Sequence, residues 1–438
     1  MITRTLFTAI TCAAALTASA QTADTWTLDS CIAYATTHNI SVRQSRVQQL
    51  NSEIALTAAK DAFLPQLHGS ASQSWAFGRG LTADNTYADR NTSSTGLSVG
   101  LQLPVFQGLR ALRGVEYAKA DLAATLEQAE ATRDNVELRV ISYYLQALLS
   151  RELLTVARNQ AALSETELNR RTILLEAGKI PELDLIEAQS QLAQDRMSVV
   201  SCESDVQLAL LNLAQLLELP AELPFDVAPL DTTSITFGNA YRLSPEEIYA
   251  IANSRNHSIR AASLSAEAAR KNIKVAQSGY IPTLSFSAGL GSNYYRMGGV
   301  TNESFGSQMR HNFSQNLGLS LSVPIFDAFS TRNNVRRAKA SALAADLQLE
   351  STRIDVENAI NQAYAQATTS RAKEQSARSA MTHAQAALAA VTEKYNAGRA
   401  TPTEWEQAKT TATRAEAEAV QARYEYLLRL RVLDFYAR

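Results

Sequence analysis

The chain contains two copies of one pattern, and this duplication constrains its fold more than any other feature of the sequence. Residues 39–43 (NISVR) match residues 256–260 (NHSIR), and AFLPQL at 62–67 matches GYIPTL at 279–284. Further along, LPVF at 103–106 matches VPIF at 323–326, and AGK at 177–179 matches AGR at 397–399. Because the landmarks keep their order over roughly 190 residues per copy, the two copies are expected to share one architecture.

Long helices are expected in both copies, because glycine and proline are scarce outside two short windows. Thirteen of the 17 glycines lie in residues 62–108 and 279–328, whereas residues 115–177 and 325–397 contain neither glycine nor proline. These two stretches are rich in good helix formers, and at 1.5 Å per residue each could extend on the order of 100 Å. Apolar residues recur in them every seven positions, which predicts coiled-coil packing. The ladder is Val140, Ala147, Leu154, Ala161, Leu168 and Leu175 in copy one, and Ile360, Ala367, Met381, Leu388 and Tyr395 in copy two, where it is broken once at Glu374.

The glycine-rich windows predict two pairs of β-strands, at about 66–78 and 93–104 and at about 283–295 and 312–324. In LSVGLQL (97–103) and LGLSLSV (317–323), apolar residues alternate with small or polar ones, which is the period of a strand. Residues 62–78, 91–109, 280–295 and 311–326 contain no Asp, Glu, Lys or Arg, unlike the polar loops near 79–92 and 296–311. A soluble sheet packed on a helix would explain the alternation, but not the absence of charge from the second face.

Strands of this length and composition can cross a bilayer when tilted. Four strands do not close a barrel, and lipid does not tolerate an open sheet edge, so the strands are expected to be completed by other copies of the chain. Aromatic residues lie toward the loop ends of the strands, where they would meet the membrane interface. These residues are Trp75, Phe77, Tyr294 and Tyr295.

Each long helix is expected to end at a short turn and to be followed by a second helix. Gly178 and Gly398 fit the left-handed residue that ends a helix. In copy two, Thr401 and Glu404 have the spacing of a capping box, with Pro402 at the first helical position. In copy one, Pro181 and Asp184 provide only part of these signals for the start of a helix. Each helix–turn–helix unit therefore predicts a helical hairpin with an exposed tip.

The expected organisation follows from these elements. Residues 1–20 have the charge, apolar run and small-residue end of a signal peptide. Repeat 1 spans 21–218, with a long helix at about 107–176, a hairpin tip at 177–181 and a helix at 182–218. A proline-rich linker at 219–242 leads to repeat 2 at 243–438, with a long helix at about 327–396, a tip at 397–402 and a helix at 403–436. Cys31 and Cys202 follow the signal peptide, and the sequence leaves open whether they are free or paired.

The order of these features, twice over, resembles that of the TolC-type outer-membrane efflux proteins. The resemblance rests on the charge-free strand pairs ending in LPVF and VPIF, and on the turns followed by LIEAQSQL and WEQAKTT. It implies a homotrimer in the outer membrane of a Gram-negative bacterium. Tandem-duplicated long helices would form a coiled-coil α-barrel in the periplasm, and four strands per chain would contribute to a twelve-stranded β-barrel.

The resemblance also implies partners: outer-membrane lipid, a periplasmic adaptor protein, and an inner-membrane pump of the RND or ABC type. The function it implies is that of an exit duct for efflux or type I secretion, docked to the adaptor by the hairpin tips. A constriction near the tips would limit passage, and its candidates are chosen for their proximity to the turns. The docking positions are Gly178, Lys179, Pro181, Asp184, Gly398, Arg399, Thr401 and Glu404, and the constriction candidates are Arg170, Arg171, Glu187 and Glu393.

Other classes of function find less support in the sequence. The five histidines are dispersed and no HExxH, CxxC or GxSxG motif occurs, so no enzyme activity, metal site or cofactor is expected. With 41 Lys and Arg against 43 Asp and Glu, the chain has no basic surplus for binding nucleic acid. The main alternative is a secreted or periplasmic coiled-coil structural or adhesion protein with a small β-sheet.

Overall fold

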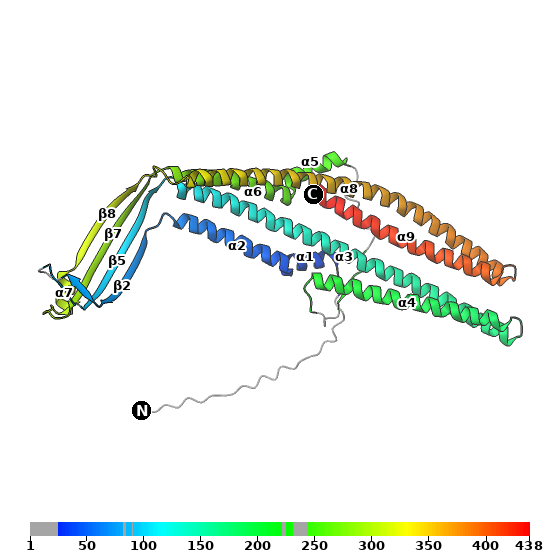
Figure 1. The fold of residues 1–438 in the computed structure, drawn as a ribbon. Helices are drawn as coiled ribbons and strands as arrows, with labels where there is room; N and C mark the ends of the chain where they lie inside the picture. Colours follow the sequence, from blue (N-terminus) through cyan, green and yellow to red (C-terminus); the bar gives the residue numbers. More distant parts are fainter. Residues whose placement is uncertain (1–24, 82–84, 90, 221–224, 231–242) are drawn as a thin grey trace, which may run out of the picture. The chain divides into compact units, whose positions relative to one another are not determined.

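The computed structural model describes residues 25–81, 85–89, 91–220, 225–230 and 243–438. Two helical hairpins contain most of the described helix (Figure 1). The first hairpin consists of α3 (Arg110–Glu176) and α4 (Glu182–Leu216), and the second of α8 (Ser330–Asn396) and α9 (Pro402–Ala437). Both α3 and α8 contain 67 residues. The predicted signal peptide lies outside the described residues, as does most of the predicted linker.

The remaining elements are shorter. They are β1 (Thr25–Trp26), α1 (Leu28–His38), α2 (Ile40–Asp61), β2 (Gln66–Ala76), β3 (Arg79–Leu81), β4 (Tyr87–Asp89), β5 (Thr92–Gln107), β6 (Asp226–Val227), α5 (Pro245–Arg255), α6 (His257–Gln277), the 3₁₀ turn η2 (Ser278–Tyr280), β7 (Thr283–Met297), α7 (Phe305–His311) and β8 (Ser314–Ser322).

The chain divides into two compact units, and each takes segments from both sequence copies. Of the described residues, those within 1–39, 136–236 and 370–428 form unit 1, and those within 40–135, 237–369 and 429–438 form unit 2. The long helices α3 and α8 contribute to both units. Each compact unit is therefore built from both sequence copies.

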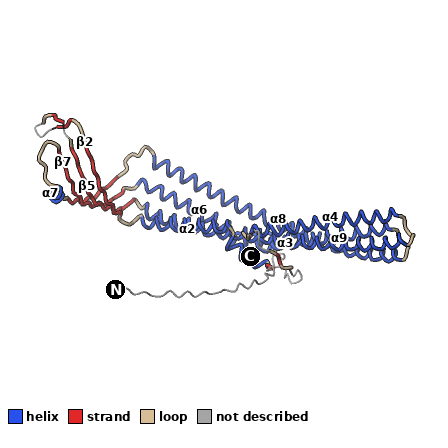
Figure 2. Tube along the Cα trace, turned by 90° about the horizontal axis from the view of Figure 1, so that it is seen from below, coloured by secondary structure: helices blue, strands red, loops and turns tan. Residues whose placement is uncertain are grey.

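Unit 2 contains a four-stranded antiparallel sheet in the order β2-β5-β7-β8 (Figures 1 and 2). Its register joins the apolar residues of all four strands on one face: Leu67 pairs with Leu101, Leu101 with Ala288, and Ala288 with Leu317. The opposite face consists largely of Ser, Gly, Asn and Gln, and Ser70 bonds to Ser98 across it at 2.7 Å. The sheet thus has one apolar face and one polar face that lacks formal charge.

The two strand-to-helix corners have the same backbone geometry. Gly108 and Leu109 have φ angles of 61° and 67°, and Ala328 and Phe329 have 52° and 63°. At Gly108 a Cβ atom would come within 2.9 Å of the Ser278 carbonyl oxygen, so glycine is required there for close packing as well as for φ. The equivalent corners are offset by 220 positions, as are the matched LPVF and VPIF segments.

Each unit has its own core. In unit 2, apolar side chains from α5, α6, α8 and α9 pack together, with Ile248, Ile360 and Leu433 fully buried. In unit 1, the parallel strands β1 and β6 are attached to α3 by Tyr144, whose hydroxyl donates to the carbonyl oxygens of Trp26 (3.1 Å) and Ala228 (2.8 Å). Arg151 bonds to the Val227 carbonyl oxygen at 2.6 Å and pairs with Asp226.

Three local features differ from the sequence expectations. The segment near 296–311, expected as a polar loop, contains the helix α7. Strand β5 continues to Gln107 and β8 ends at Ser322, so the strands that precede the two corners differ in length. In α3, Val140 and Ala147 are fully buried as predicted, but from Leu154 onward the ladder residues are half-buried. After Val156 the buried residues of α3 are all polar: Gln160, Ser164, Glu167 and Arg171.

Candidate functional site: the hairpin tips

The two hairpin turns have matching geometry. Gly178 and Gly398 adopt φ angles of 66° and 71°, as predicted for residues that end a helix in the left-handed conformation. In each turn the following residue donates its backbone N–H back to the helix: Lys179 to the Leu174 carbonyl oxygen at 2.9 Å, and Arg399 to that of Lys394 at 2.8 Å. The chain therefore presents one structural motif at two places.

The helices that follow the turns begin differently. Thr401 and Glu404 form the predicted capping box: the Thr401 N–H donates to the Glu404 carboxylate at 2.7 Å, and the Glu404 N–H donates to the Thr401 hydroxyl at 3.2 Å. Pro181 lies at the N-cap of α4 and supplies no side-chain hydrogen bond. Of the eight predicted docking residues only Asp184 is half-buried, and its backbone oxygen accepts a 2.9 Å hydrogen bond from Arg171. The other seven are exposed.

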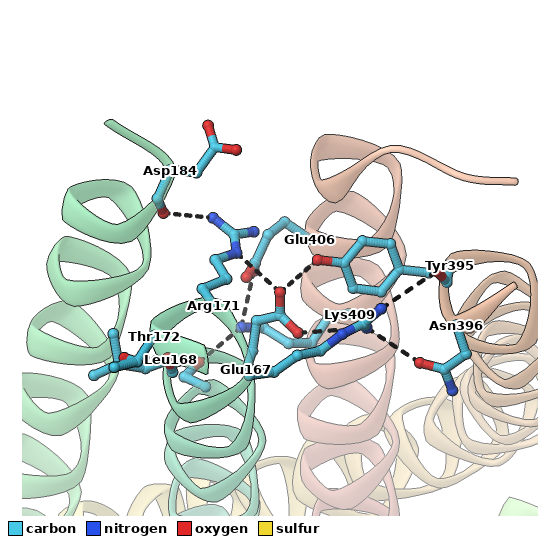
Figure 3. Close-up of polar contacts among 11 residues, drawn as sticks. Glu167, Leu168, Arg171, Thr172, Asp184, Tyr395, Asn396, Glu406 and Lys409 are labelled. Atoms are coloured by element: carbon cyan, nitrogen blue, oxygen red, sulfur yellow. Dashed lines mark hydrogen bonds and ion pairs between the residues drawn. The ribbon is translucent and has the colours of Figure 1, made fainter. Parts of the chain in front are cut away.

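Behind the turns, a buried carboxylate joins the first hairpin to the second (Figure 3). Glu167 of α3 is 5% exposed and accepts hydrogen bonds from Arg171 at 2.9 Å and from the Tyr395 hydroxyl of α8 at 2.5 Å. Burial, with the hydrogen bond and charge of Glu167, raises the pKa of Tyr395 above its ordinary value, so the phenol stays protonated and donates. Although burial alone would lower it, the hydrogen bond from Arg171 to Glu167 raises the pKa of Arg171.

Arg170 adds a second connection between the hairpins at the same level. Its guanidinium lies over the Tyr395 ring, 4.2 Å from the centroid, and donates to the Asn396 side-chain oxygen at 3.1 Å. Trp405 of α9 is stacked on the ring of Tyr395, with 5.7 Å between the two ring centroids. Tyr395 is therefore held by groups from α3 and α9 together. We refer to Glu167, Arg170, Arg171, Tyr395 and Trp405 as the tyrosine cluster.

A second polar cluster lies further along the same helices and centres on Lys409. Its ammonium group is fully buried, 2.7 Å from the Ser164 hydroxyl, 2.8 Å from the Glu406 carboxylate and 3.8 Å from that of Asp195. Ser164 also donates to Asp195 of α4. This lysine cluster (Ser164, Asp195, Glu406 and Lys409) thus joins α3, α4 and α9. Buried charges of this kind require their partners, because an unpaired ion in a protein interior costs several kcal/mol.

The structure places the four constriction candidates in two different environments. Glu187 and Glu393 are exposed beside the turns. Arg171 is 4% exposed and bonded to Glu167, and Arg170 is half-buried against Tyr395. The sequence expectation did not include Glu167, Tyr395 or Lys409 as site residues: a ladder read from apolar residues passes over Glu167 and Lys409, and it counted Tyr395 only as a packing residue. The spacing of Gln160, Ser164, Glu167 and Arg171, three or four positions apart, is the signal that would have found Glu167.

The four aromatics expected at the membrane interface do not share one face of the sheet. Trp75 and Tyr294 lie on the apolar face, where Tyr294 contacts Phe305 edge-to-face with 5.2 Å between centroids. Tyr295 projects to the polar face, opposite Ser94. Phe77 follows the end of β2 and is 79% exposed. If Tyr295 lies at the membrane interface, its side chain therefore extends from the polar face of the sheet.

The described residues contain neither a metal-binding cluster nor a helix that could span a membrane. Among the described residues, no group of three or more His, Cys, Asp or Glu side chains is arranged to hold a metal ion. Within the same ranges, no helix is long and apolar enough to cross a membrane. Cys31 is free and buried, and burial raises its pKa to about 12, while Cys202 is free and half-buried.

Comparison with known proteins identifies the family. The family model described as outer membrane efflux protein matches residues 32–218 and 248–437, one segment in each sequence copy. The chain belongs to the outer membrane efflux protein family. Its relatives include the outer membrane protein TolC of Escherichia coli K12, 26% identical over 89% of this chain and 78% of TolC. The outer membrane efflux protein BepC of Brucella suis is 21% identical over 92% of this chain and 83% of BepC.

The solved structures agree on the fold of this outer membrane efflux protein. A CusC crystal structure superposes with a TM-score of 0.77 at 18% identity, covering 94% of this chain and 91% of CusC. Family membership confirms the outer-membrane location and the function as an exit duct of the efflux and type I secretion kind. It also decides against the alternative of a coiled-coil adhesion protein.

Proposed function

We propose that three copies of this efflux protein assemble into a passive duct, in which four strands from each chain complete a twelve-stranded barrel. The edges of the four-stranded sheet support this assembly. Strands β2 and β8 lie at the two edges, and Leu317, Leu319 and Leu321 of β8 are 65–78% exposed in the single chain. In lipid, edge backbone groups need a hydrogen-bond partner, and a neighbouring copy supplies it.

The hairpin tips are proposed to dock a periplasmic adaptor that is bound to an inner-membrane pump. Two observations support this role: seven of the eight docking residues are exposed, and the turns at Gly178 and Gly398 have the same geometry. Each chain would offer two similar docking positions, so a trimer would offer six.

Replacing Gly178 and Gly398 together by Trp tests the docking role. Export is expected to be lost while the trimer persists, measured by substrate efflux in cells and by native gel electrophoresis. Gly299→Trp is the matched control, since Gly299 also has a left-handed φ, at 82°, and a Cβ there would meet nothing within 4 Å, but the residue lies in unit 2. Normal export by the double variant would contradict the proposal.

The tyrosine cluster is proposed to hold the tip end of the duct closed until the adaptor separates the hairpins. The carrying observation is that Glu167 of α3 binds Tyr395 of α8, so the two hairpins of one chain cannot separate without exposing a buried carboxylate. Hydrogen bonds to charged groups contribute about 1.5–3 kcal/mol each, which is roughly a 10- to 150-fold bias toward the closed arrangement.

Tyr395→Phe tests this closure directly, because it removes the hydroxyl and keeps the ring that contacts Arg170 and Trp405. The variant is expected to raise the single-channel conductance of the purified protein in planar bilayers. Tyr280→Phe serves as the control, since Tyr280 is 55% exposed and lies in unit 2. Equal conductance of Tyr395→Phe and the unmodified protein would contradict the role of the cluster.

The four constriction candidates take separate roles in this proposal. Glu187 and Glu393 remain exposed, and three copies of each would form acidic rings at the entrance to the duct. Arg170 and Arg171 act within the tyrosine cluster instead, because their guanidinium groups are engaged by Tyr395 and Glu167. Neutralising the glutamates as Glu187→Gln and Glu393→Gln is expected to reduce cation selectivity, measured as a reversal potential in a salt gradient.

A further inference from the structure

At the Met297 end of β7, side chains make the backbone hydrogen bonds that a neighbouring strand would otherwise make. β7 runs to Met297, but its pairing with β8 ends at Gly291 opposite Ser314. Beyond that point Gln308 of α7 bonds to both backbone groups of Tyr295, at 2.9 and 3.0 Å. Asn302 does the same for Met297 at 2.9 and 2.8 Å. The segment that contains α7 (Figure 1) therefore replaces the continuation of β8 and fixes its first residue at Ser314.

The amide of Asn312 completes this arrangement by donating to the Asn293 carbonyl oxygen at 2.7 Å. Residues 293, 295 and 297 are alternate positions, so their backbone groups point to the same edge of β7. Three side-chain amides thus act as a substitute strand along this edge. On this side of the sheet, the edge that is offered to another chain is consequently limited to β8 itself.

The lengths of the edge strands restrict how two copies can pair. β2 has 11 residues and β8 has nine, and adjoining copies would pair them antiparallel, because each strand is antiparallel to the next across the sheet. If every residue of β8 has a partner in β2, Ser314 lies opposite Ser74, Trp75 or Ala76 of the neighbour. Any other register leaves part of β8 without a strand partner in the membrane.

The faces of the sheet reduce these three registers to two. Leu67 and Leu317 lie on the same face, so the apolar face carries the odd-numbered residues of both β2 and β8. Residues directly opposite each other share a face, and a one-residue slip would turn the apolar side chains of one copy to the polar side. Ser314 therefore lies opposite Ser74 or Ala76, and not opposite Trp75.

We propose that Phe313, immediately before β8, packs against an aromatic side chain of the next copy in an outer seam between subunits. Phe313 lies beside Trp75 in one register and beside Phe77 in the other. All three side chains are exposed in the single chain, at 52%, 65% and 79%. Aromatic pairs of this kind add to the apolar area that they bury. The inference rests on the proposed trimer and assigns its strand register and one of its contacts.

Cysteine cross-linking tests the register. Ser314→Cys is combined with Ser74→Cys, Ala76→Cys or Trp75→Cys in a Cys202→Ser background, in which Cys31 is fully buried. β2 and β8 lie at opposite edges of one sheet, about 14 Å apart at 4.8 Å per strand, whereas a disulfide needs Cα atoms within about 7 Å. Any disulfide therefore joins two chains, and is seen as a covalent oligomer on a denaturing gel.

Oxidation in native membranes is expected to link position 314 to 74 or to 76 faster than to 75. Fastest linking through position 75, or no link at all in a protein that runs as a trimer on a native gel, would overturn the assigned register. A protein that runs as a monomer would instead overturn the proposed trimer, so the two failures are distinguishable.

The aromatic contact is tested by trimer heat resistance. Phe313→Ala is expected to lower the temperature at which the trimer dissociates in detergent, and to have no further effect once the aromatic identified by cross-linking is also replaced by Ala. Phe326→Ala is the matched control, because Phe326 is 74% exposed and lies beyond the other end of β8. If Phe313→Ala and the Ala substitution of the partner aromatic lowered the dissociation temperature additively in the double variant, the contact would be contradicted.

Discussion

Replacing Lys409 by Met removes the only positive charge of the lysine cluster while keeping the length and apolar character of the side chain. The ammonium group lies 2.8 Å from Glu406 and 3.8 Å from Asp195, with the lysine side chain fully buried. The Glu406 side chain is 26% exposed and can turn toward water, but that of Asp195 is 9% exposed and would remain as a buried carboxylate without a cation.

The expected loss is large because it includes the cost of the remaining charge. Removing one partner of a buried ion pair typically costs about 3–5 kcal/mol, whereas an exposed pair contributes about 1 kcal/mol or less. Lys373 offers the exposed comparison in the same unit: it pairs with Glu425 at 2.9 Å, and its side chain is 57% exposed. The double variant Lys409→Met with Asp195→Asn is expected to regain more than half of the loss, since the neutral amide needs no counter-charge.

Native-state amide hydrogen exchange measures this effect within the folded protein. Because each 1.4 kcal/mol is a factor of ten, Lys409→Met should speed exchange in α4 and α9 around the cluster by roughly 10²- to 10⁴-fold. Lys373→Met should change it by less than about tenfold. Exchange in Lys409→Met within twofold of that in Lys373→Met would refute the reasoning that the buried ion pairs hold α9 to the first hairpin.

Three further outcomes are expected. In the native protein a thiol reagent should modify Cys202 and leave Cys31 unmodified, because burial raises the pKa of Cys31 from 9.0 to about 12 and suppresses its thiolate; mass spectrometry that finds equal labelling would contradict this. Tyr144→Phe should destabilise the attachment of β1 and β6 by about 1–3 kcal/mol through two lost hydrogen bonds, seen as faster exchange at residues 25–28 and 226–228 and not in α9. The fold favours the protonated phenol of Tyr395, so the stability that its hydrogen bond contributes is fully present below the ordinary pKa of 10.0 and is lost as pH rises through the higher pKa of the folded state. Single-channel conductance should therefore be constant from about pH 7 to 9. An increase within that range would contradict the role of Tyr395 in closure.

Local sequence signals determined much of the fold. The absence of glycine and proline over residues 115–177 and 325–397 predicts α3 and α8, because glycine disfavours a helix through its conformational freedom and proline through its missing N–H. The turn at Gly398 and the capping box of Thr401 and Glu404 were also predictable, since their contacts join residues no more than five positions apart. Alternation likewise predicted the apolar face of the sheet, because strand periodicity is a property of the backbone.

Only the tertiary structure decided which polar residues are buried and what they bind. Glu167 and Tyr395 are 228 positions apart, and nothing near either residue indicates that one accepts a hydrogen bond from the other. Lys409 resembles the many charged residues of an exposed helix face until α3 and α4 are placed against it. The amides of Asn302 and Gln308 likewise sit in a polar loop by sequence, and their role along β7 depends on where β8 ends. Sequence thus specifies elements through short-range hydrogen bonding and periodicity, whereas burial and partner choice depend on which helix or strand faces a residue across the fold.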